Sequence, residues 1–316
     1  MTKPNVLVMW PVRPIAQAQL ETAYTLFRYD EAEDKPGYLA EYGPLCEAAV
    51  VNGHVTLTRD MLDHLPNVKG VACSSAGFDK IDVRALRDRG IWFTNTSQAL
   101  RNDVADMAVL LTLATCRQLI ATHEHVRSGA WGRSGPYPLL RSLAGQRIGI
   151  VGLGNIGSTI AKRFEGFAVD IGYTDVAPKD VPYTFLPDLM ALATWADVLI
   201  VMVPGGAATR NLIDRPVMEA IGPTGTLINI SRGEVVDEPA LTEALKSGKL
   251  GSAGLDVYHH EPNPSPALTA LPNVTLSPHH SSGTVESRDA MHQLVVDNLA
   301  AHFAGMPLLT PVYRLP

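Results

Sequence analysis

The chain has 316 residues, of which 46% are hydrophobic and 18% charged, and its formal net charge is −6. This length exceeds what one hydrophobic core usually serves, so two domains of ordinary size are expected. The small negative charge and the lack of long runs of Lys and Arg argue against nucleic acid as a partner.

The cysteines and the apolar runs are typical of a cytoplasmic protein. Cys46, Cys73 and Cys116 are far apart and form no C-x-x-C pair, which argues against both a disulfide framework and a zinc site. The N-terminus leads directly into an apolar run, without the charged and apolar regions of a secretory signal. The longest apolar stretches, such as residues 198–203, are too short to cross a bilayer.

The first hundred residues alternate short apolar runs with helical patterns, which predicts a small α/β unit with a mostly parallel sheet. The predicted strands are residues 6–10, 48–51, 68–74 and 91–94, and the predicted helices are residues 58–65 and 83–89.

A long helical pattern follows, from Asn102 to about residue 128. Asn102 is a suitable N-cap, and Asp103 and Asp106 place acids in the first turn. The pattern predicts a helix that links two domains.

Residues 147–157 combine an apolar run with three glycines spaced G-x-G-x-x-G, and a helical pattern follows them. This is the dinucleotide-binding fingerprint. Gly152 allows the tight turn, Gly154 lets the backbone approach a pyrophosphate, and Gly157 lets the helix lie on the sheet. A second apolar run, residues 168–173, ends near Asp175, at about the 20-residue distance where an acid reaches the ribose hydroxyls.

The alternation of strand and helix patterns continues after the fingerprint and completes a doubly wound sheet. The predicted strands are residues 198–203, 226–230, 252–257 and 274–276, and the predicted helices lie near residues 187–194, 215–221 and 238–247. A last helix, from residue 285 to about 303, and a short tail are expected to return to the first unit.

These patterns predict an α/β protein of two Rossmann-like or flavodoxin-like domains, each with a doubly wound parallel sheet, and a cleft between them. Residues 1–98 with 286–316 are expected to form the substrate-binding (catalytic) domain, and residues 99–285 the dinucleotide-binding Rossmann domain.

Ligands bind beyond the carboxyl ends of strands in such sheets, so the residues that follow each apolar run are the candidates for chemistry. An arginine, two acids and a histidine stand there: Arg232, Asp256, Glu261 and His279. Each alone is more often a surface or structural residue. Their coincidence beside a nucleotide site favours an active site.

A series of short motifs runs in order along most of the chain: Ala76-Gly77-Phe78-Asp79-Lys80-Ile81-Asp82, Asn95-Thr96, Asp103-Val104-Ala105-Asp106, Gly152-Leu153-Gly154-Asn155-Ile156-Gly157, Asn229-Ile230-Ser231-Arg232-Gly233, Val236-Asp237-Glu238, Gly254-Leu255-Asp256-Val257, Glu261-Pro262 and Pro278-His279. In these motifs the chain resembles the D-isomer-specific 2-hydroxyacid dehydrogenases. It is most similar to their glyoxylate/hydroxypyruvate and hydroxyphenylpyruvate reductase branch.

The resemblance implies NAD(P)H-dependent reduction of a small 2-oxo acid to the D-2-hydroxy acid by a homodimer. It implies that Arg232, Glu261 and His279 are catalytic, with His279 as the general acid, and that Asp256 contacts the nicotinamide amide. Substrate binding is assigned to the backbone N–H groups of Ser75, Ala76 and Gly77, with Arg232 and His279. The implied cofactor-binding residues are Gly152, Gly154, Asn155, Ile156, Gly157, Thr174, Asp175, Val203, Pro204, Thr209, Ile230, Ser231, Arg232, Asp256 and His279.

The chemistry of a 2-oxo acid agrees with these roles. Its carboxylate and carbonyl oxygen need a cation and amide donors, which Arg232 and the loop after Ser74 can supply. Reduction places charge on the carbonyl oxygen, so a group that titrates near neutrality, such as His279, suits the acid. A carboxylate behind the imidazole, here Glu261, orients it and favours its charged form.

Asp175-Val176 predicts a preference for NAD(H), because relatives that use NADP carry a small polar residue and an Arg at these positions. Lys179 is the only nearby cation that could admit NADP(H).

Asn52-Gly53-His54 and the Ser75-Ala76-Gly77 loop are expected to line one wall of the substrate site. The small side chains of that loop favour glyoxylate and hydroxypyruvate as substrates, with an aryl pyruvate as the alternative. The opposite wall is expected around residues 131–140, from the same chain or a dimer mate.

Two departures from the family pattern stand out: His280-Ser281 replaces an apolar-Gly pair, and Gly205-Gly206 replaces a Leu-Thr pair. Two other functions have some support in the sequence. The histidine pairs His259-His260 and His279-His280 suggest a metal site, but their spacing is not the helical H-x-x-x-H spacing of metal ligands. A non-catalytic, dinucleotide-sensing corepressor could share the fold. The intact Arg232, Glu261 and His279 favour the enzyme.

Overall fold

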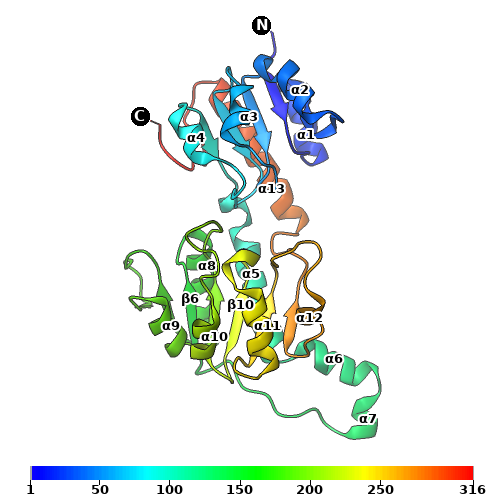
Figure 1. Cartoon of the computed structure of the whole chain (residues 1–316), viewed down its shortest axis with the longest axis vertical. Helices are drawn as coiled ribbons and strands as arrows, with labels where there is room; N and C mark the ends of the chain where they lie inside the picture. The colour runs from blue at the N-terminus through cyan, green and yellow to red at the C-terminus, as the bar shows by residue number, and fades with distance from the viewer. Residues whose placement is uncertain (1, 316) are drawn as a thin grey trace. The chain divides into compact units, whose positions relative to one another are not determined.

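The computed structural model describes residues 2–315, which divide into two compact units (Figure 1). Unit 1 comprises residues 1–100 and 282–316, and unit 2 comprises residues 101–281. The end positions 1 and 316 of the predicted domains lie outside the described residues. Both units carry a parallel sheet between helices, so the predicted fold class is confirmed. Which unit binds substrate and which binds dinucleotide stays a prediction.

Unit 1 is built on a five-stranded sheet in the order β2-β1-β3-β4-β5, in which every pairing is parallel. All residues of β3 and β4 are buried, because helices cover both faces of the sheet. The strands are β1 (Asn5–Val8), β2 (Thr25–Arg28), β3 (Ala48–Val51), β4 (Gly70–Cys73) and β5 (Trp92–Thr94).

Side chains of these strands alternate between two apolar clusters, one on each face. One cluster includes Leu7 and Val71, and the other includes Val6 and Ala72 with Leu299 of the last helix. The last helix therefore packs on the sheet of unit 1. The helices of unit 1 are α1 (Pro14–Ala23), α2 (Lys35–Tyr42), α3 (Arg59–Asp63), α4 (Val83–Asp88) and α13 (Val285–Phe303), with 3-10 turns η1 (Tyr29–Glu31) and η2 (Gly43–Leu45).

Unit 2 contains a seven-stranded parallel sheet in the order β12-β11-β10-β9-β6-β7-β8. The chain order reverses between β6 and β9, which is the position where doubly wound sheets bind nucleotides. The strands are β6 (Arg147–Val151), β7 (Asp170–Thr174), β8 (Thr184–Phe185), β9 (Val198–Val201), β10 (Thr226–Asn229), β11 (Ser252–Leu255) and β12 (Val274–Leu276).

Three helices of unit 2 begin at aspartates. Asp188, Asp214 and Asp237 each accept a hydrogen bond from a backbone N–H of the first helical turn. The helices are α6 (Leu119–Arg127), α7 (Ala130–Ser134), α8 (Asn155–Phe164), α9 (Leu189–Trp195), α10 (Arg215–Ile221), α11 (Glu238–Lys246) and α12 (Pro266–Thr269), with 3-10 turns η3 (Glu165–Phe167) and η4 (Gly233–Val235).

The prediction of one helix from Asn102 to about residue 128 is wrong at its start and in its middle. Helix α5 (Ser97–Cys116) begins directly after β5, because no breaker separates the two, and Asn102 lies inside it. Gln118 then adopts a left-handed backbone with φ 44°, which ends α5 and starts α6. The two helices bend by 58° at this break.

Among residues 2–315, no single helix is long and apolar enough to cross a membrane. The bent pair α5 and α6 passes that test only when the two are taken together, by length and composition.

Candidate active site

The polar residues predicted to carry chemistry follow three neighbouring strands of unit 2. Arg232 follows β10, Asp256 and Glu261 follow β11, and His279 follows β12. Strands β10, β11 and β12 are adjacent and parallel, so these residues leave the sheet at one edge.

His279 and Glu261 form a close pair. The His279 Nδ1 atom lies 2.7 Å from Glu261 Oε2, and each side chain is about one third exposed. The backbone N–H of Tyr258 donates to the other Glu261 oxygen at 3.0 Å. Glu261 therefore has a fixed orientation and holds Nδ1, so proton transfer by this imidazole, if it occurs, would take place at Nε2.

The backbone of His279 is unusual. Its φ of 52° lies in the left-handed region, which a non-glycine residue seldom adopts. Its N–H donates to the Asp256 carbonyl oxygen at 2.7 Å, which ties the turn to the end of β11. Strained residues of this kind gather at functional sites.

Asp256 is fully buried and holds the same turn through its carboxylate. One oxygen accepts the N–H of His280 at 2.8 Å, and the other accepts the N–H of Ser281 at 3.0 Å and its hydroxyl. The side chain of His280 itself is exposed. Contact of Asp256 with a nicotinamide amide stays a prediction.

Arg232 stands in a loop that Asn229 and Gly233 shape. The Asn229 amide donates to the Arg232 carbonyl at 2.9 Å, and the Arg232 guanidinium donates to the Ser231 carbonyl at 2.7 Å. A Cβ on Gly233 would overlap the backbone of Tyr258. Only glycine allows this approach, which brings the Arg232 loop against the segment that carries Glu261.

The glycine loop between β6 and α8 fits a dinucleotide pyrophosphate. Gly152 has φ 93°, and an added Cβ would lie 2.5 Å from the Met202 carbonyl oxygen. A Cβ on Gly157 would overlap the Gly152 carbonyl, whereas the space beside Gly154 is open. No side chain caps the start of α8 at Gly154, so its N–H groups and dipole suit an anion.

Asp175 follows β7 beside this loop. It accepts hydrogen bonds from the backbone N–H groups of Leu153 at 3.0 Å and Val176 at 2.7 Å, and its carboxylate lies 2.9 Å from Lys179 Nζ. Burial alone would raise the pKa of Asp175, but the hydrogen bonds from Lys179, Val176 and Leu153 outweigh it and lower this pKa. The carboxylate is therefore ionised at neutral pH.

The other predicted cofactor residues also lie at strand ends or at the start of α8. The Thr209 hydroxyl donates to the Pro204 carbonyl at 2.7 Å, which closes the loop after β9. Their contacts with a dinucleotide stay predictions. By element they are Thr174 at the end of β7, Asn155 and Ile156 at the start of α8, Val203, Pro204 and Thr209 after β9, and Ile230 and Ser231 after β10.

In unit 1 the predicted substrate loop follows β4. The Ser75 hydroxyl accepts the Gly53 N–H at 2.8 Å and donates to the Gly77 carbonyl at 2.6 Å, and Asn95 donates to the Ala76 carbonyl at 3.1 Å. Within residues 2–315, the backbone N–H groups of Ser75, Ala76 and Gly77 have no acceptor. Adjacent N–H groups of this kind form an anion site.

Sequence reasoning missed two supporting residues. The Tyr258 hydroxyl donates to the Ser277 carbonyl at 2.8 Å, and burial raises the pKa of Tyr258 to about 12. Glu238, which is buried, accepts the His259 N–H at 2.9 Å. Tyr258 lies three residues after the end of β11, between Asp256 and Glu261 in the sequence, and this position was the available signal.

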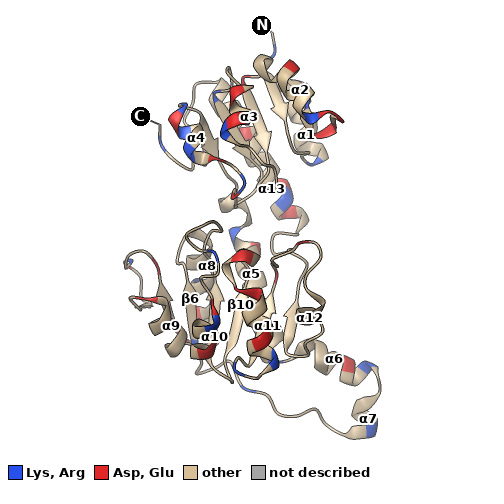
Figure 2. Cartoon of the chain, in the orientation of Figure 1, with Lys and Arg blue, Asp and Glu red and all other residues tan. Residues whose placement is uncertain are grey.

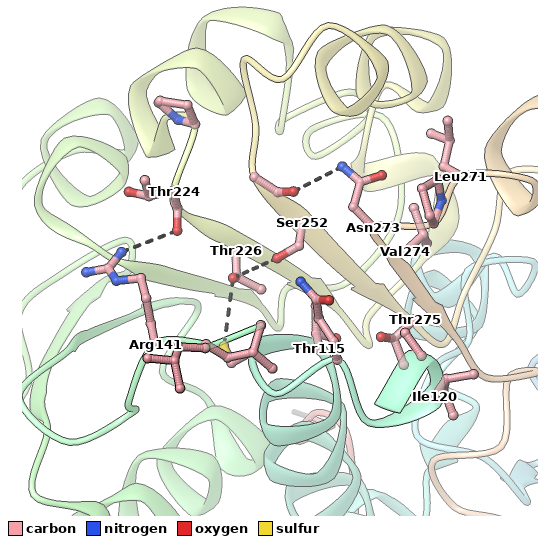
Figure 3. A pocket seen from close by; sticks show the side chains of 18 of the residues that line it. Thr115, Ile120, Arg141, Thr224, Thr226, Ser252, Leu271, Asn273, Val274 and Thr275 are labelled. Carbon is pink, nitrogen blue, oxygen red and sulfur yellow. Dashed lines mark hydrogen bonds between the residues drawn. The ribbon is translucent and has the colours of Figure 1, made fainter. Parts of the chain in front are cut away.

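A cavity of about 540 Å³ lies at the opposite edge of the same sheet (Figure 3). Thr226 and Ser252, the first residues of β10 and β11, line it and share a hydrogen bond of 2.9 Å. The amino ends of the strands lie there, so this cavity is separate from the predicted catalytic residues. Among the described residues, no group of three or more His, Cys, Asp and Glu side chains is arranged to hold a metal ion.

Comparison with known proteins identifies related chains. The family model described as "D-isomer specific 2-hydroxyacid dehydrogenase, NAD binding domain" matches residues 109–281. A 2-ketogluconate reductase of Gluconobacter oxydans is 41% identical over 98% of this chain and 99% of its own. A glyoxylate/hydroxypyruvate reductase A of Arabidopsis thaliana is 43% identical over 98% of both chains. A hydroxyphenylpyruvate reductase of Plectranthus scutellarioides is 42% identical, also over 98% of both.

Two crystal structures share the whole fold. A 2-hydroxyacid dehydrogenase from Ketogulonicigenium vulgare has a TM-score of 0.92 at 46% identity, over 99% of both chains. An NADPH-dependent glyoxylate/hydroxypyruvate reductase from Sinorhizobium meliloti, in complex with NADP and malonate, has a TM-score of 0.89 at 38% identity. The match covers 98% of this chain and 97% of that one.

Proposed function

The chain belongs to the D-isomer specific 2-hydroxyacid dehydrogenase family, and we propose that it reduces a small 2-oxo acid, glyoxylate or hydroxypyruvate, to the 2-hydroxy acid, which is the D-2-hydroxy acid where the product is chiral, with His279 as the general acid. It is an NAD(P)-dependent oxidoreductase that acts on small 2-oxo acids. The named relatives are reductases and dehydrogenases, so the corepressor alternative is not favoured.

The observation that carries this proposal is the 2.7 Å contact between His279 Nδ1 and Glu261 Oε2. A bound reduced nicotinamide supplies the hydride. His279 donates a proton from Nε2 to the carbonyl oxygen as charge develops there, and Glu261 stabilises the imidazolium. Glu261 acts through His279, because its other oxygen holds the Tyr258 N–H.

Arg232 and the substrate loop bind the 2-oxo acid in this proposal. The guanidinium of Arg232 offers charged donors to the carboxylate and carbonyl oxygen. The N–H groups of Ser75, Ala76 and Gly77 bind the carboxylate, and the hydrogen bonds of Ser75 hold their shape.

We further propose that NAD(H) is the preferred cofactor and NADP(H) a possible one. Asp175 supports this preference, since its ionised carboxylate attracts ribose hydroxyls, whereas a 2′-phosphate gains nothing from a carboxylate. The change of Asp175 to Ser with Val176 to Arg is expected to shift the ratio of kcat/KM toward NADPH. A wild-type kcat/KM that is higher with NADPH than with NADH would contradict the preference.

The substrate proposal is tested with a panel of 2-oxo acids: glyoxylate, hydroxypyruvate, pyruvate, phenylpyruvate, 4-hydroxyphenylpyruvate and 2-ketogluconate, each with NADH and with NADPH. We expect the highest kcat/KM for glyoxylate or hydroxypyruvate. The alternative is an aryl pyruvate reductase, which the relationship to the Plectranthus enzyme supports. A highest kcat/KM for 4-hydroxyphenylpyruvate would establish that alternative.

A homodimer is proposed from the resemblance and from the apolar surface of unit 2. Leu119, Ile120 and Val126 of α6 are each more than half exposed, and Leu139 is fully exposed. Single chains seldom leave such a set uncovered. Sedimentation equilibrium is expected to give twice the chain mass, and a monomer would contradict the proposal.

The proposed partners are small acids in the cytoplasm, without nucleic acid or membrane. Figure 2 shows Lys and Arg interspersed with Asp and Glu along both units, and together with the formal net charge of −6 this supports the proposal that nucleic acid is not a partner. Cys46, Cys73 and Cys116 are free thiols, which agrees with a reducing compartment.

A further inference from the structure

The loop after β7 is anchored to its own strand. The Lys179 N–H donates to the Tyr173 hydroxyl at 2.7 Å, and that hydroxyl donates back to the Lys179 carbonyl at 3.3 Å. Tyr173 is buried in β7. The lysine side chain therefore starts from a fixed backbone position beside Asp175.

The ammonium group of Lys179 joins two parts of the dinucleotide fingerprint. Its Nζ lies 2.9 Å from Asp175 Oδ2 and 2.6 Å from the carbonyl oxygen of Leu153, which stands between Gly152 and Gly154. The Lys179 side chain is 36% exposed and that of Asp175 is 15% exposed, so the pair is reachable from solvent.

The Asp175 carboxylate can accept few further hydrogen bonds from the hydroxyls of a ribose. A carboxylate accepts about four hydrogen bonds. Val176 donates to Oδ1, while Leu153 and Lys179 donate to Oδ2. The carboxylate can then hold one further hydroxyl, and it can hold both ribose hydroxyls only when Lys179 moves away.

Lys179 also changes the charge that a cofactor meets. A 2′-phosphate carries a charge of about −1.5 to −2 and would be repelled by an unpaired Asp175. The pair has no net charge, and the ammonium group carries three donors on a flexible stem that can turn to a phosphate.

We propose that Lys179 sets the balance between the two cofactors: it occupies Asp175, which weakens the hold on NAD(H), and it offers its ammonium group to the 2′-phosphate of NADP(H). The inference rests on the proposed dinucleotide-dependent reduction. It makes the preference for NAD(H) small, and it places the control of that preference on one residue.

The test is Lys179→Met, with dissociation constants for NADH and NADPH measured by fluorescence titration in the absence of 2-oxo acid. Loss of a charge-assisted hydrogen bond should raise the Kd for NADPH by about 10-fold. The Kd for NADH should stay the same or fall, because Asp175 becomes available for both ribose hydroxyls. A Kd ratio within about twofold of the wild-type ratio would overturn the proposal.

Two further variants separate position from charge. Lys179→Arg keeps the cation and should retain NADPH binding. Lys249→Met removes another paired lysine of unit 2, whose Nζ lies 2.7 Å from Glu219 Oε1, and should change neither Kd. A shift toward NADH in the Lys249 variant as large as that in Lys179→Met would show a nonspecific charge effect and overturn the proposal.

The interaction of Lys179 with the adenosine ribose and its 2′-phosphate is also tested with fragments that lack nicotinamide. Adenosine 2′,5′-bisphosphate should lose affinity in Lys179→Met, whereas 5′-AMP should not. Equal losses for the two fragments would overturn the role of Lys179. If the wild-type protein bound neither NADH nor NADPH, both the proposed function and this inference would fail. If the wild type reduced 2-oxo acids normally and Lys179→Met left the Kd ratio unchanged, only this inference would fail.

Discussion

Both units place their functional loops at the carboxyl ends of a parallel sheet, but the loops present different chemistry. In unit 2 the loops carry charged side chains, among them Arg232, Glu261 and His279. In unit 1 the loop after β4 presents the backbone N–H groups of Ser75, Ala76 and Gly77. Proton transfer needs a titratable side chain, whereas a carboxylate can be bound by backbone amides alone. Changes to the proton-transfer pair His279 and Glu261 of unit 2 should therefore affect kcat, and changes in the unit 1 loop should affect KM.

The largest expected effect comes from His279→Ala in unit 2. Loss of the general acid should lower kcat for 2-oxo acid reduction by about 10²–10⁴-fold. The Kd for NADH should stay close to the wild-type value, since the glycine loop and Asp175 are unchanged. Steady-state kinetics and fluorescence titration on the same preparation measure both quantities.

The matched control is His280→Ala, which removes the exposed neighbouring imidazole and leaves the His280 N–H bond to Asp256 in place. We expect a kcat near that of the wild type. A collapse of kcat in the His280 variant, together with a nearly normal His279 variant, would reverse the assignment.

The second prediction concerns stability instead of catalysis, and it rests on a buried histidine of unit 1. His292 accepts the Arg13 N–H through Nδ1 at 2.9 Å. Burial, with the charges of Arg288 and Arg13, lowers the pKa of His292 from 6.5 to about 4. The unfolded chain therefore binds more protons between these values. Unit 1 should have its full stability above pH 6.5 and lose up to about 3 kcal/mol as the pH falls toward 4.

Urea unfolding of the wild type and of His292→Gln at several pH values measures this effect. The amide oxygen of Gln can accept the same bond without titrating, so the variant should show a flatter pH dependence between 4 and 6.5. Equal slopes in the two proteins would rule out His292 as the cause.

The smallest expected effect is that of Gly53→Ala in unit 1. The added Cβ would overlap the Gly77 carbonyl and displace the substrate loop. KM for the 2-oxo acid should rise by about 10-fold, while kcat changes less, since the loop binds substrate and transfers no proton. Gly166→Ala, which has open space around the new Cβ, should leave KM unchanged. A fall in kcat at constant KM would contradict the division of roles between the units.

The same difference between the units explains how much could be predicted from the sequence. Polar residues that follow apolar runs predicted Arg232, Glu261 and His279 as site residues, because each lies within a few residues of the end of its strand in the sequence. Strand β12 and helix α10 have the predicted bounds. Strand β2 (Thr25–Arg28) was missed, because this edge strand is short and only partly buried.

Features that depend on backbone geometry or on distant partners were not predictable. Gln118 breaks α5 from α6 through a left-handed backbone without any Gly or Pro to signal it. The partners of Asp256 are N–H groups of residues 280 and 281, far along the chain. The sequence likewise indicated Lys179 as a nearby cation but could not show that its ammonium group lies on both Asp175 and Leu153.

The most direct test of the central claim is the product formed from hydroxypyruvate and NADH. One glycerate should appear for each NADH oxidised, and chiral chromatography should detect only the D enantiomer. L-glycerate, or a lack of NADH oxidation with every 2-oxo acid of the panel and with either cofactor, would contradict the account.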